Sequence, residues 1–210
     1  MGIVLDKDDG KILLLSKYVL DCQVYNDSYV STDWKSCSLR RWLNNTFFSN
    51  AFTKEEAQIV LETVVSNSIQ EQPEKKKWQP VACADTKDKV FPLSFREYSF
   101  YLPYDFATRG TAYAEKKGSK GVFWDKEATQ ATRSSGKNAK EYTYMYATED
   151  PSSCSVDLKN GIRPAIWIDS LEYNKGNDMA GRSRSSLSNY SRQLAAKDSK
   201  YPFRVFGCLI

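Results

Sequence analysis

The residue types that most enzymes use for acid–base or metal chemistry are scarce in this sequence. It contains no histidine, which removes the commonest general base, the commonest metal ligand and the Ser–His and Cys–His nucleophile pairs. Adjacent carboxylates occur at residues 55–56 and 149–150, where a capped helix and a following proline favour solvated side chains. We therefore expect a protein that is not an enzyme, with no catalytic residues, no metal and no cofactor.

The cysteines offer little more. There are five, far apart and without a Cys-x-x-Cys motif, which argues against a zinc knuckle or ribbon. An odd number also fits poorly with a complete set of disulfides. We expect buried, unreactive thiols. The five are Cys22, Cys37, Cys83, Cys154 and Cys208.

Length and composition indicate one domain over residues 1–210. Of the 210 residues, 41% are hydrophobic and 13% aromatic, enough to fill a sizeable core. The net charge of +4 is small and the basic and acidic residues are interspersed along the chain, so we expect no nucleic-acid partner. No apolar stretch reaches the ~20 residues of a membrane span, and the N-terminus lacks the pattern of a secretory signal. The sequence as written predicts a cytoplasmic protein, or one at the cell surface if a leader has been removed.

The N-terminal part predicts a hairpin followed by two helices. Apolar runs at residues 3–5 and 11–18 flank a turn of Asp8, Asp9 and Gly10, which is typical of paired strands. Apolar residues then recur at helical spacing after residues 36–38. Thr53 and Glu56 form a capping box, which predicts a second helix extending to about Val64.

The remaining pattern alternates loops, short helices and strands. A polar segment at residues 66–87 reads as a long surface loop around Trp78. A buried strand is expected at residues 89–93, and helices at 95–101, after the cap residue Ser94, and at 108–117. Further strands are expected at 142–147, 154–158 and 161–168. This order predicts the α+β class, with an antiparallel sheet.

Two arginine–tryptophan pairs stand inside these elements, Arg40 with Trp42 and Arg163 with Trp167. They could form a cation–π cage for a ligand. Their positions within helix and strand patterns favour a core role, with Arg163 bound to carbonyls or a carboxylate.

Several strings resemble, in order, the bacterial family of domains of unknown function numbered 6273. They include SKYVLDCQVYN, TDWKSCSLRRWLNNTFFSNAFTKEE, DKVFPLSFRE, TRSSG and NGIRPAIWID, and the resemblance runs from residue 3 to residue 169. The chain departs from the family pattern around residues 123–136 and continues for about forty residues beyond the last string.

That family is in turn similar to the C-type-lectin-like scaffold shared with formylglycine-generating enzymes and with the variable proteins of diversity-generating retroelements. The resemblance implies short helices packed on small antiparallel sheets, with long irregular loops forming a binding face. It also implies a closing strand at residues 203–210 that pairs with the first strand. An enzyme of the formylglycine-generating type would need two cysteines for copper, and Cys154 with Cys208 is the pair that could converge.

The expected function is a non-catalytic module that binds a protein or glycan ligand through its loops. The candidate contacts share the Tyr, Asn and Arg chemistry of binding surfaces, or are aromatic rim residues. They are Arg182, Arg184, Asn189, Tyr190 and Arg192, with Trp78, Tyr142 and Tyr144 at the rim. Two alternatives remain open: a hypervariable target-binding protein diversified by a retroelement over residues 181–200, and a structural accessory domain. The oligomeric state is open too.

Overall fold

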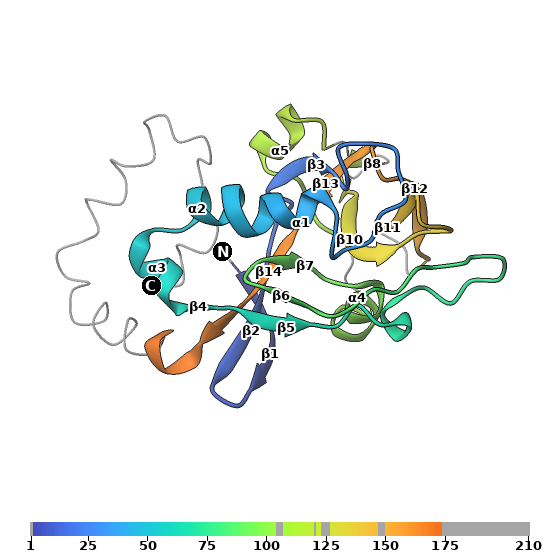
Figure 1. Cartoon of the computed structure of the whole chain (residues 1–210). Helices are drawn as coiled ribbons and strands as arrows, with labels where there is room; N and C mark the ends of the chain where they lie inside the picture. The colour runs from blue at the N-terminus through green and yellow to red at the C-terminus, as the bar shows by residue number, and fades with distance from the viewer. Residues whose placement is uncertain (1, 104–106, 120, 123–126, 147–149, 174–210) are drawn as a thin grey trace.

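The largest sheet joins the N-terminal hairpin to strands from the middle and end of the family-like region (Figure 1). The computed structural model describes residues 2–103, 107–119, 121–122, 127–146 and 150–173. The strand order is β1-β2-β14-β4, with β7 also paired to β14, and every pairing is antiparallel. The strands are β1 (Gly2–Asp8), β2 (Lys11–Ser16), β14 (Pro164–Asp169), β4 (Val60–Leu61) and β7 (Phe91–Pro92).

Turn chemistry and burial explain this sheet. Asp9 and Gly10 have φ values of 37° and 75°, the two left-handed positions that a two-residue hairpin turn requires. β2 contributes an unbroken buried run from Ile12 to Ser16, so both of its faces are covered, while its two edges pair with β1 and β14. The predicted hairpin is therefore confirmed, whereas the single strand predicted at residues 161–168 is divided between the end of β13 (Lys159–Ile162), which pairs with another strand, and β14.

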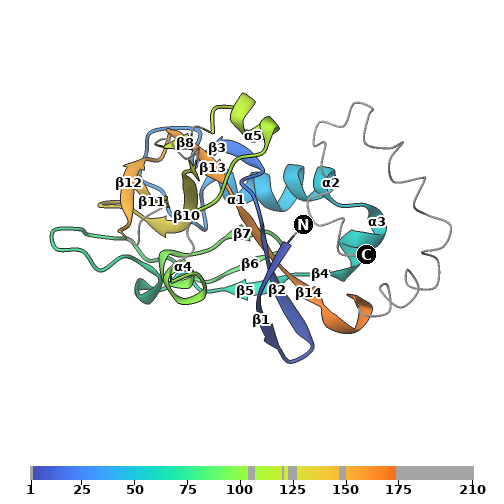
Figure 2. The same ribbon diagram turned by 180° about the vertical axis from the view of Figure 1, so that it is seen from behind.

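Four smaller antiparallel sheets complete the strands. β10, β11 and β12 form a three-stranded sheet, while β3 pairs with β13, β5 with β6, and β8 with β9. Their bounds are β10 (Gln130–Ser135), β11 (Glu141–Met145), β12 (Ser152–Ser155), β3 (Asp21–Val24), β13 (Lys159–Ile162), β5 (Thr63–Val65), β6 (Thr86–Asp88), β8 (Gly121–Val122) and β9 (Glu127–Ala128). Viewed from behind, β10–β12 lie at the opposite end of the molecule from β4 (Figure 2).

The helices are short and begin where the sequence supplies caps. A continuous helical segment runs through α1 (Ser38–Trp42), the π-helical turn η1 (Leu43–Phe47) and α2 (Phe48–Ala51). It buries Leu39, Leu43 and Phe47, which lie four residues apart on one face. The remaining helices are α3 (Lys54–Ile59), α4 (Phe95–Tyr101), α5 (Ala112–Lys116) and the 3₁₀ turn η2 (Ile69–Glu71). The predicted capping boxes of α3 and α4 are both present.

Aromatic side chains fill the space between these layers. Trp34, Tyr25, Tyr98 and Phe91 are each at most 2% exposed and belong to one hydrophobic cluster with the buried leucines of β2 and α1. The structure is therefore α+β, with short helices packed on small antiparallel sheets.

One predicted element was too long and one strand was not predicted. The helix after Thr53 ends at Ile59, because residues 60–61 pair as β4 with Trp167 and Ile168 of β14. The sequence also gave no sign of β10, whose six residues are all buried. The strand expected at residues 203–210 lies outside the described residues.

Gly161 of β13 tests this packing. A Cβ atom at this position would lie 2.2 Å from the carbonyl oxygen of Thr129 and 2.8 Å from Cγ1 of Val19. The carbonyl oxygen of Thr129 is a backbone atom and cannot easily move aside. We therefore expect Gly161→Ala to lower the free energy of unfolding by about 1–3 kcal/mol. Gly110→Ala is the control, since its nearest neighbour is the flexible side chain of Glu115 at 3.3 Å. Equal denaturant midpoints for the two variants would contradict this account.

Candidate binding surface

Buried charges hold the motifs of this chain in place, beginning with Asp88 of β6. Its carboxylate accepts hydrogen bonds from Trp34 Nε1 at 2.9 Å, Arg40 Nε at 2.6 Å and Thr86 Oγ1 at 2.6 Å. Asn44 adds a bond to the carbonyl oxygen of Val90 at 3.0 Å. The segment from Trp34 to Asn44 therefore attaches α1 and η1 to β6 and to Val90, which follows it. This is the structural role predicted for Arg40.

Arg133 of β10 is a second buried charge, with a side chain only 1% exposed. Its guanidinium forms a two-pronged ion pair with Glu97 of α4, with one N–O distance of 2.7 Å, and lies 3.6 Å from the carboxylate of Glu71. It also donates to the carbonyl oxygens of Ser66 and Pro92. These bonds satisfy the cation in a site that excludes water.

The two serines after Arg133 attach a long loop, residues 66–85, to β10. Ser134 Oγ donates to the carbonyl oxygen of Glu71 at 2.6 Å, and the Ser135 amide donates to Gln72 Oε1 at 2.8 Å. On the returning arm, the Val81 amide donates to Ser135 Oγ at 2.7 Å. Both arms of the loop are thus fixed to one strand.

Arg163, the residue between β13 and β14, belongs to a third polar cluster. It is 2% exposed and donates to the carbonyl oxygen of Ser16 at 2.8 Å and to Gln130 Oε1 at 3.1 Å. The predicted carbonyl-binding role of Arg163 is confirmed, and the cation–π cage with Trp167 is not needed to explain it.

The tip of loop 66–85 extends from the body between β5 and β6 (Figure 1). Lys75 Nζ donates to the carbonyl oxygen of Pro151 at 3.1 Å and pairs with Asp150 at 3.6 Å. The Gln79 amide donates to the carbonyl oxygen of Lys137 at 2.9 Å. The tip is therefore held against the β10–β11 turn.

A third segment joins this turn from the other side. The Thr32 amide donates to the carbonyl oxygen of Ala139 at 2.8 Å. We call the exposed side chains of residues 27–36, 74–81 and 137–140 the loop face. On it, Tyr29, Val30 and Val81 are 57%, 50% and 37% exposed.

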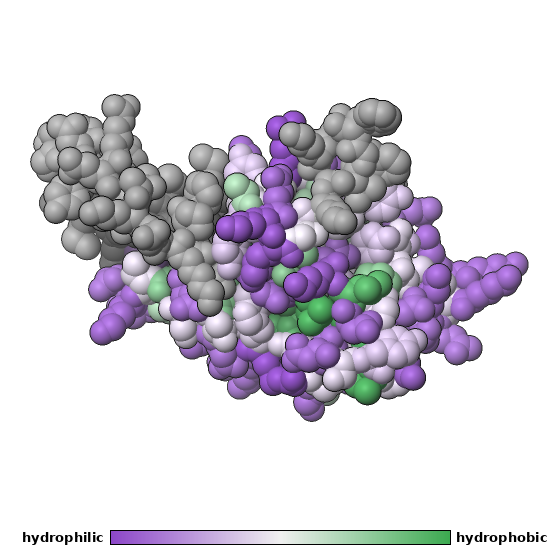
Figure 3. Space-filling view, turned by 90° about the horizontal axis from the view of Figure 1, so that it is seen from above, coloured by the Kyte–Doolittle hydropathy of each residue, from purple (hydrophilic) through white to green (hydrophobic). Residues whose placement is uncertain are grey.

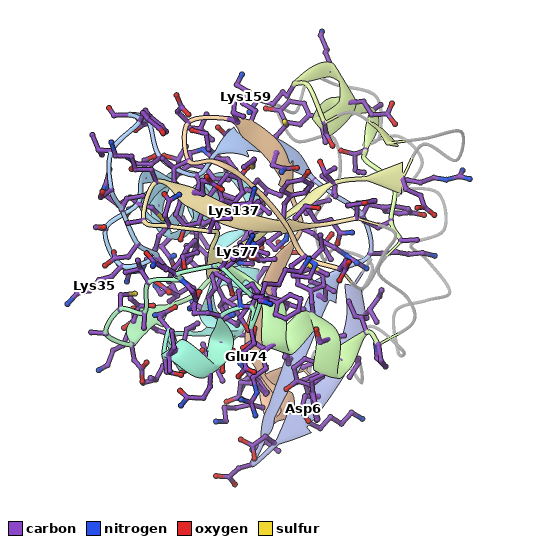
Figure 4. The ribbon with its side chains drawn as sticks, turned by 90° about the vertical axis from the view of Figure 1, so that its right-hand side faces the viewer. Asp6, Lys35, Glu74, Lys77, Lys137 and Lys159 are labelled. Atoms are coloured by element: carbon purple, nitrogen blue, oxygen red, sulfur yellow. The ribbon has the colours of Figure 1, made fainter. Side chains whose placement is uncertain are left out.

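Lysines dominate the charge of the loop face. Five are exposed, and none forms a salt bridge with any described residue: Lys35, Lys76, Lys77, Lys137 and Lys140. Figure 4 shows Lys77 and Lys137, from two different loops, close together near the centre of the view, with Lys35 projecting at its left edge. The exposed acids of these segments are Asp27 and Glu74. Seen from above, the neighbouring surface is largely hydrophilic, with small hydrophobic patches (Figure 3).

Aromatic rings hold two lysines of this region in place. Lys140 Nζ lies 5.0 Å from the ring centroid of Tyr29, and Lys75 Nζ lies 5.5 Å from that of Trp78. Both distances fall within the range of a cation–π interaction. Each contact restricts a long side chain that would otherwise sample many rotamers.

The rim residues chosen from the sequence are not all on the surface. Trp78 is half-buried within the loop face, and Tyr144 is half-buried against the core. Tyr142 is fully buried: its ring stacks on Tyr25 at 4.9 Å, and its hydroxyl donates to the carbonyl oxygen of Leu158 at 3.2 Å. Tyr142 therefore cannot contact a ligand at the rim without the core opening.

The other proposed contacts lie outside the described residues, as does the segment 181–200 in which diversification was considered. They are Arg182, Arg184, Asn189, Tyr190 and Arg192. Sequence reasoning missed Tyr29, Lys35 and Lys137, because the bonds that bring their loops together are between backbone groups.

The thiols described here are poorly suited to chemistry. Burial raises the pKa of Cys37 to about 12. Burial is also the main cause that raises the pKa values of Cys22, Cys83 and Cys154, so all four are protonated near neutral pH and are weak nucleophiles. Within the described ranges, no three His, Cys, Asp or Glu side chains gather as a metal site. Cys208, the proposed partner of Cys154, is outside them.

The fold and surface define an α+β domain with an exposed, lysine-rich face built by loops. The sequence profile of the family named Domain of unknown function (DUF6273) matches residues 9–170, and the chain belongs to this family. Neither the comparison with curated proteins nor that with solved structures gives a match. No helix in the described part of the chain is long and apolar enough to cross a membrane.

The buried cation of Arg133 provides a stability test. We expect Arg133→Met to lower the free energy of unfolding by about 3 kcal/mol or more, because it leaves Glu97 and Glu71 without their partner. Arg41→Met is the matched control: Arg41 is exposed, and we expect a change within about 0.5 kcal/mol. Urea denaturation of both variants measures the difference, and a small effect at Arg133 would contradict the assigned role.

The backbone of the loop tip provides another test. Lys77 has a φ of 75°, a left-handed conformation that strains residues other than glycine. We expect Lys77→Gly to raise the free energy of unfolding by up to about 1 kcal/mol. Lys76 is not among the described positive-φ residues, so Lys76→Gly should have the opposite sign through added unfolded-chain entropy. Thermal unfolding of the two variants measures the difference. A shift of the melting temperature in the same direction for both would contradict the left-handed conformation assigned to Lys77.

Proposed function

We propose that this protein is a non-catalytic recognition module that binds a protein or glycan ligand through the loop face. The observation that carries the proposal is the assembly of three segments, distant in sequence, into one surface by backbone hydrogen bonds from Thr32 to Ala139 and from Gln79 to Lys137. Binding residues are found disproportionately on loops that a rigid scaffold positions.

The side chains of this surface support the same function. Tyr29 is 57% exposed and Val30 is 50% exposed, although burial of such apolar groups would stabilise the folded chain. A tyrosine in this position offers a large contact area with few rotatable bonds. The half-buried ring of Trp78 extends the apolar part of the surface.

The buried polar clusters of the molecule stabilise the fold. Asp88, Arg133 and Arg163 are each fully or almost fully buried and hydrogen-bonded to neighbouring segments. A buried charge satisfied in this way is not free to act on a substrate. This favours binding over catalysis.

The resemblance to the C-type-lectin-like scaffold supports the proposal at the level of fold. A scaffold of small sheets and short helices that leaves its long loops at one end is suited to presenting a binding surface. The ligand must be argued from the residues of the loop face, because a fold hosts many functions.

Arrays of glycans and of peptides, probed with the wild type and with Tyr29→Ala, test the proposal. We expect at least one ligand whose affinity falls about tenfold or more in Tyr29→Ala, since an exposed aromatic anchor contributes strongly to an interface. Val4→Ala, at a 51% exposed position on β1, should bind as the wild type does. Wild-type protein that retains no ligand, or ligands that bind Tyr29→Ala equally well, would refute the loop face as the site.

A further inference from the structure

We infer that the ligand of the loop face is an acidic polypeptide segment, bound by its carboxylates to the lysines and by its apolar side chains to the rings and valines between them. This inference rests on the proposed function and names the class of ligand. It follows from the charges of the loop face, the state of its aromatic rings and the spacing of its acids.

The loop face carries an unmatched positive charge. The five exposed lysines come from three loops and form no salt bridge with described residues, whereas the exposed acids of the same segments number two, Asp27 and Glu74. Of the further acids, Asp33 accepts hydrogen bonds from the Ser36 amide and hydroxyl, and Glu141 accepts from Ser153. The surface therefore presents ammonium groups that a negative partner would complement.

One of these lysines is already ordered by an aromatic ring. The ring of Tyr29 holds the ammonium group of Lys140 at 5.0 Å, so an incoming carboxylate would meet a cation with fewer rotamers to lose. The same contact occupies a face of the Tyr29 ring, and Lys75 similarly lies over Trp78. A ligand that contacts these rings therefore also meets a positive charge beside them, which favours a negatively charged ligand.

The exposed acids and apolar groups of the loop face favour a polypeptide over a polynucleotide. A nucleic acid carries a dense, regular array of phosphates, which would repel Asp27 and Glu74 among the lysines. A polypeptide can place its carboxylates opposite the lysines alone. It can also set apolar side chains against Tyr29, Val30 and Val81, which the phosphate backbone cannot do.

Fluorescence anisotropy with a labelled glutamate–leucine copolymer peptide tests the inference, at low and at physiological salt. We expect the wild type to bind the peptide. We expect the affinity of the double variant Lys137→Glu/Lys140→Glu to be lower by about tenfold or by a larger factor. The control is Lys7→Glu/Lys54→Glu, which changes the net charge equally at exposed positions on β1 and α3. Its affinity should stay within about twofold of the wild type, because screening limits the effect of distant charges.

Competing polyanions complete the experiment: a single-stranded oligonucleotide, a heparin oligosaccharide and phosphatidylcholine–phosphatidylserine vesicles. Tighter binding of any of these than of the peptide would overturn the inference, as would absent peptide binding or an equal loss in both double variants. If Tyr29→Ala loses its array ligand while Lys137→Glu/Lys140→Glu retains it, the loop face stays the binding site and its ligand is not acidic. If neither variant affects binding, the proposed function fails as well.

Discussion

The cation of Arg133 is buried, and the fold has to surround it with oxygen atoms. An unpaired guanidinium at 1% exposure would be too costly to keep, so Glu97, Glu71 and the carbonyl groups of Ser66 and Pro92 must converge on it. Those partners come from α4, from loop 66–85 and from the end of β7. One charge therefore determines the relative positions of three elements that share no continuous sheet.

The loop face depends on this arrangement. Ser134 and Ser135 follow Arg133 on β10 and hold both arms of loop 66–85 through Glu71, Gln72 and Val81. The tip of that loop can then reach the β10–β11 turn, where Gln79 binds the backbone of Lys137. A surface of exposed lysines and an exposed tyrosine is thus supported by these hydrogen bonds. For the ligand that we propose, such a surface would be a preformed site with a lower entropic cost of binding.

The positive side chains of the molecule have two different roles. The arginines Arg40, Arg133 and Arg163 make two-pronged or multiple bonds within the protein, for which the planar guanidinium is suited. The cations of the loop face are lysines, whose flexible stems keep a hydrated charge at the surface. The internal bonds therefore maintain the fold, while the charges of the loop face remain at the surface.

Local patterns in the sequence determined the elements whose signals are local. The Asp9–Gly10 turn, the capping boxes at Thr53 and Ser94, the α+β class and the structural role of Arg163 could all be predicted, because each depends on residues a few positions apart or on an evident apolar pattern. Only the tertiary structure decided that residues 60–61 leave the helix, since their strand partner lies a hundred residues away in β14. It alone buried Tyr142 against Tyr25 and brought Tyr29, Trp78 and Lys137 to one surface. Those outcomes depend on backbone hydrogen bonds between distant loops, and backbone groups are the same at every residue, so no side-chain pattern records them.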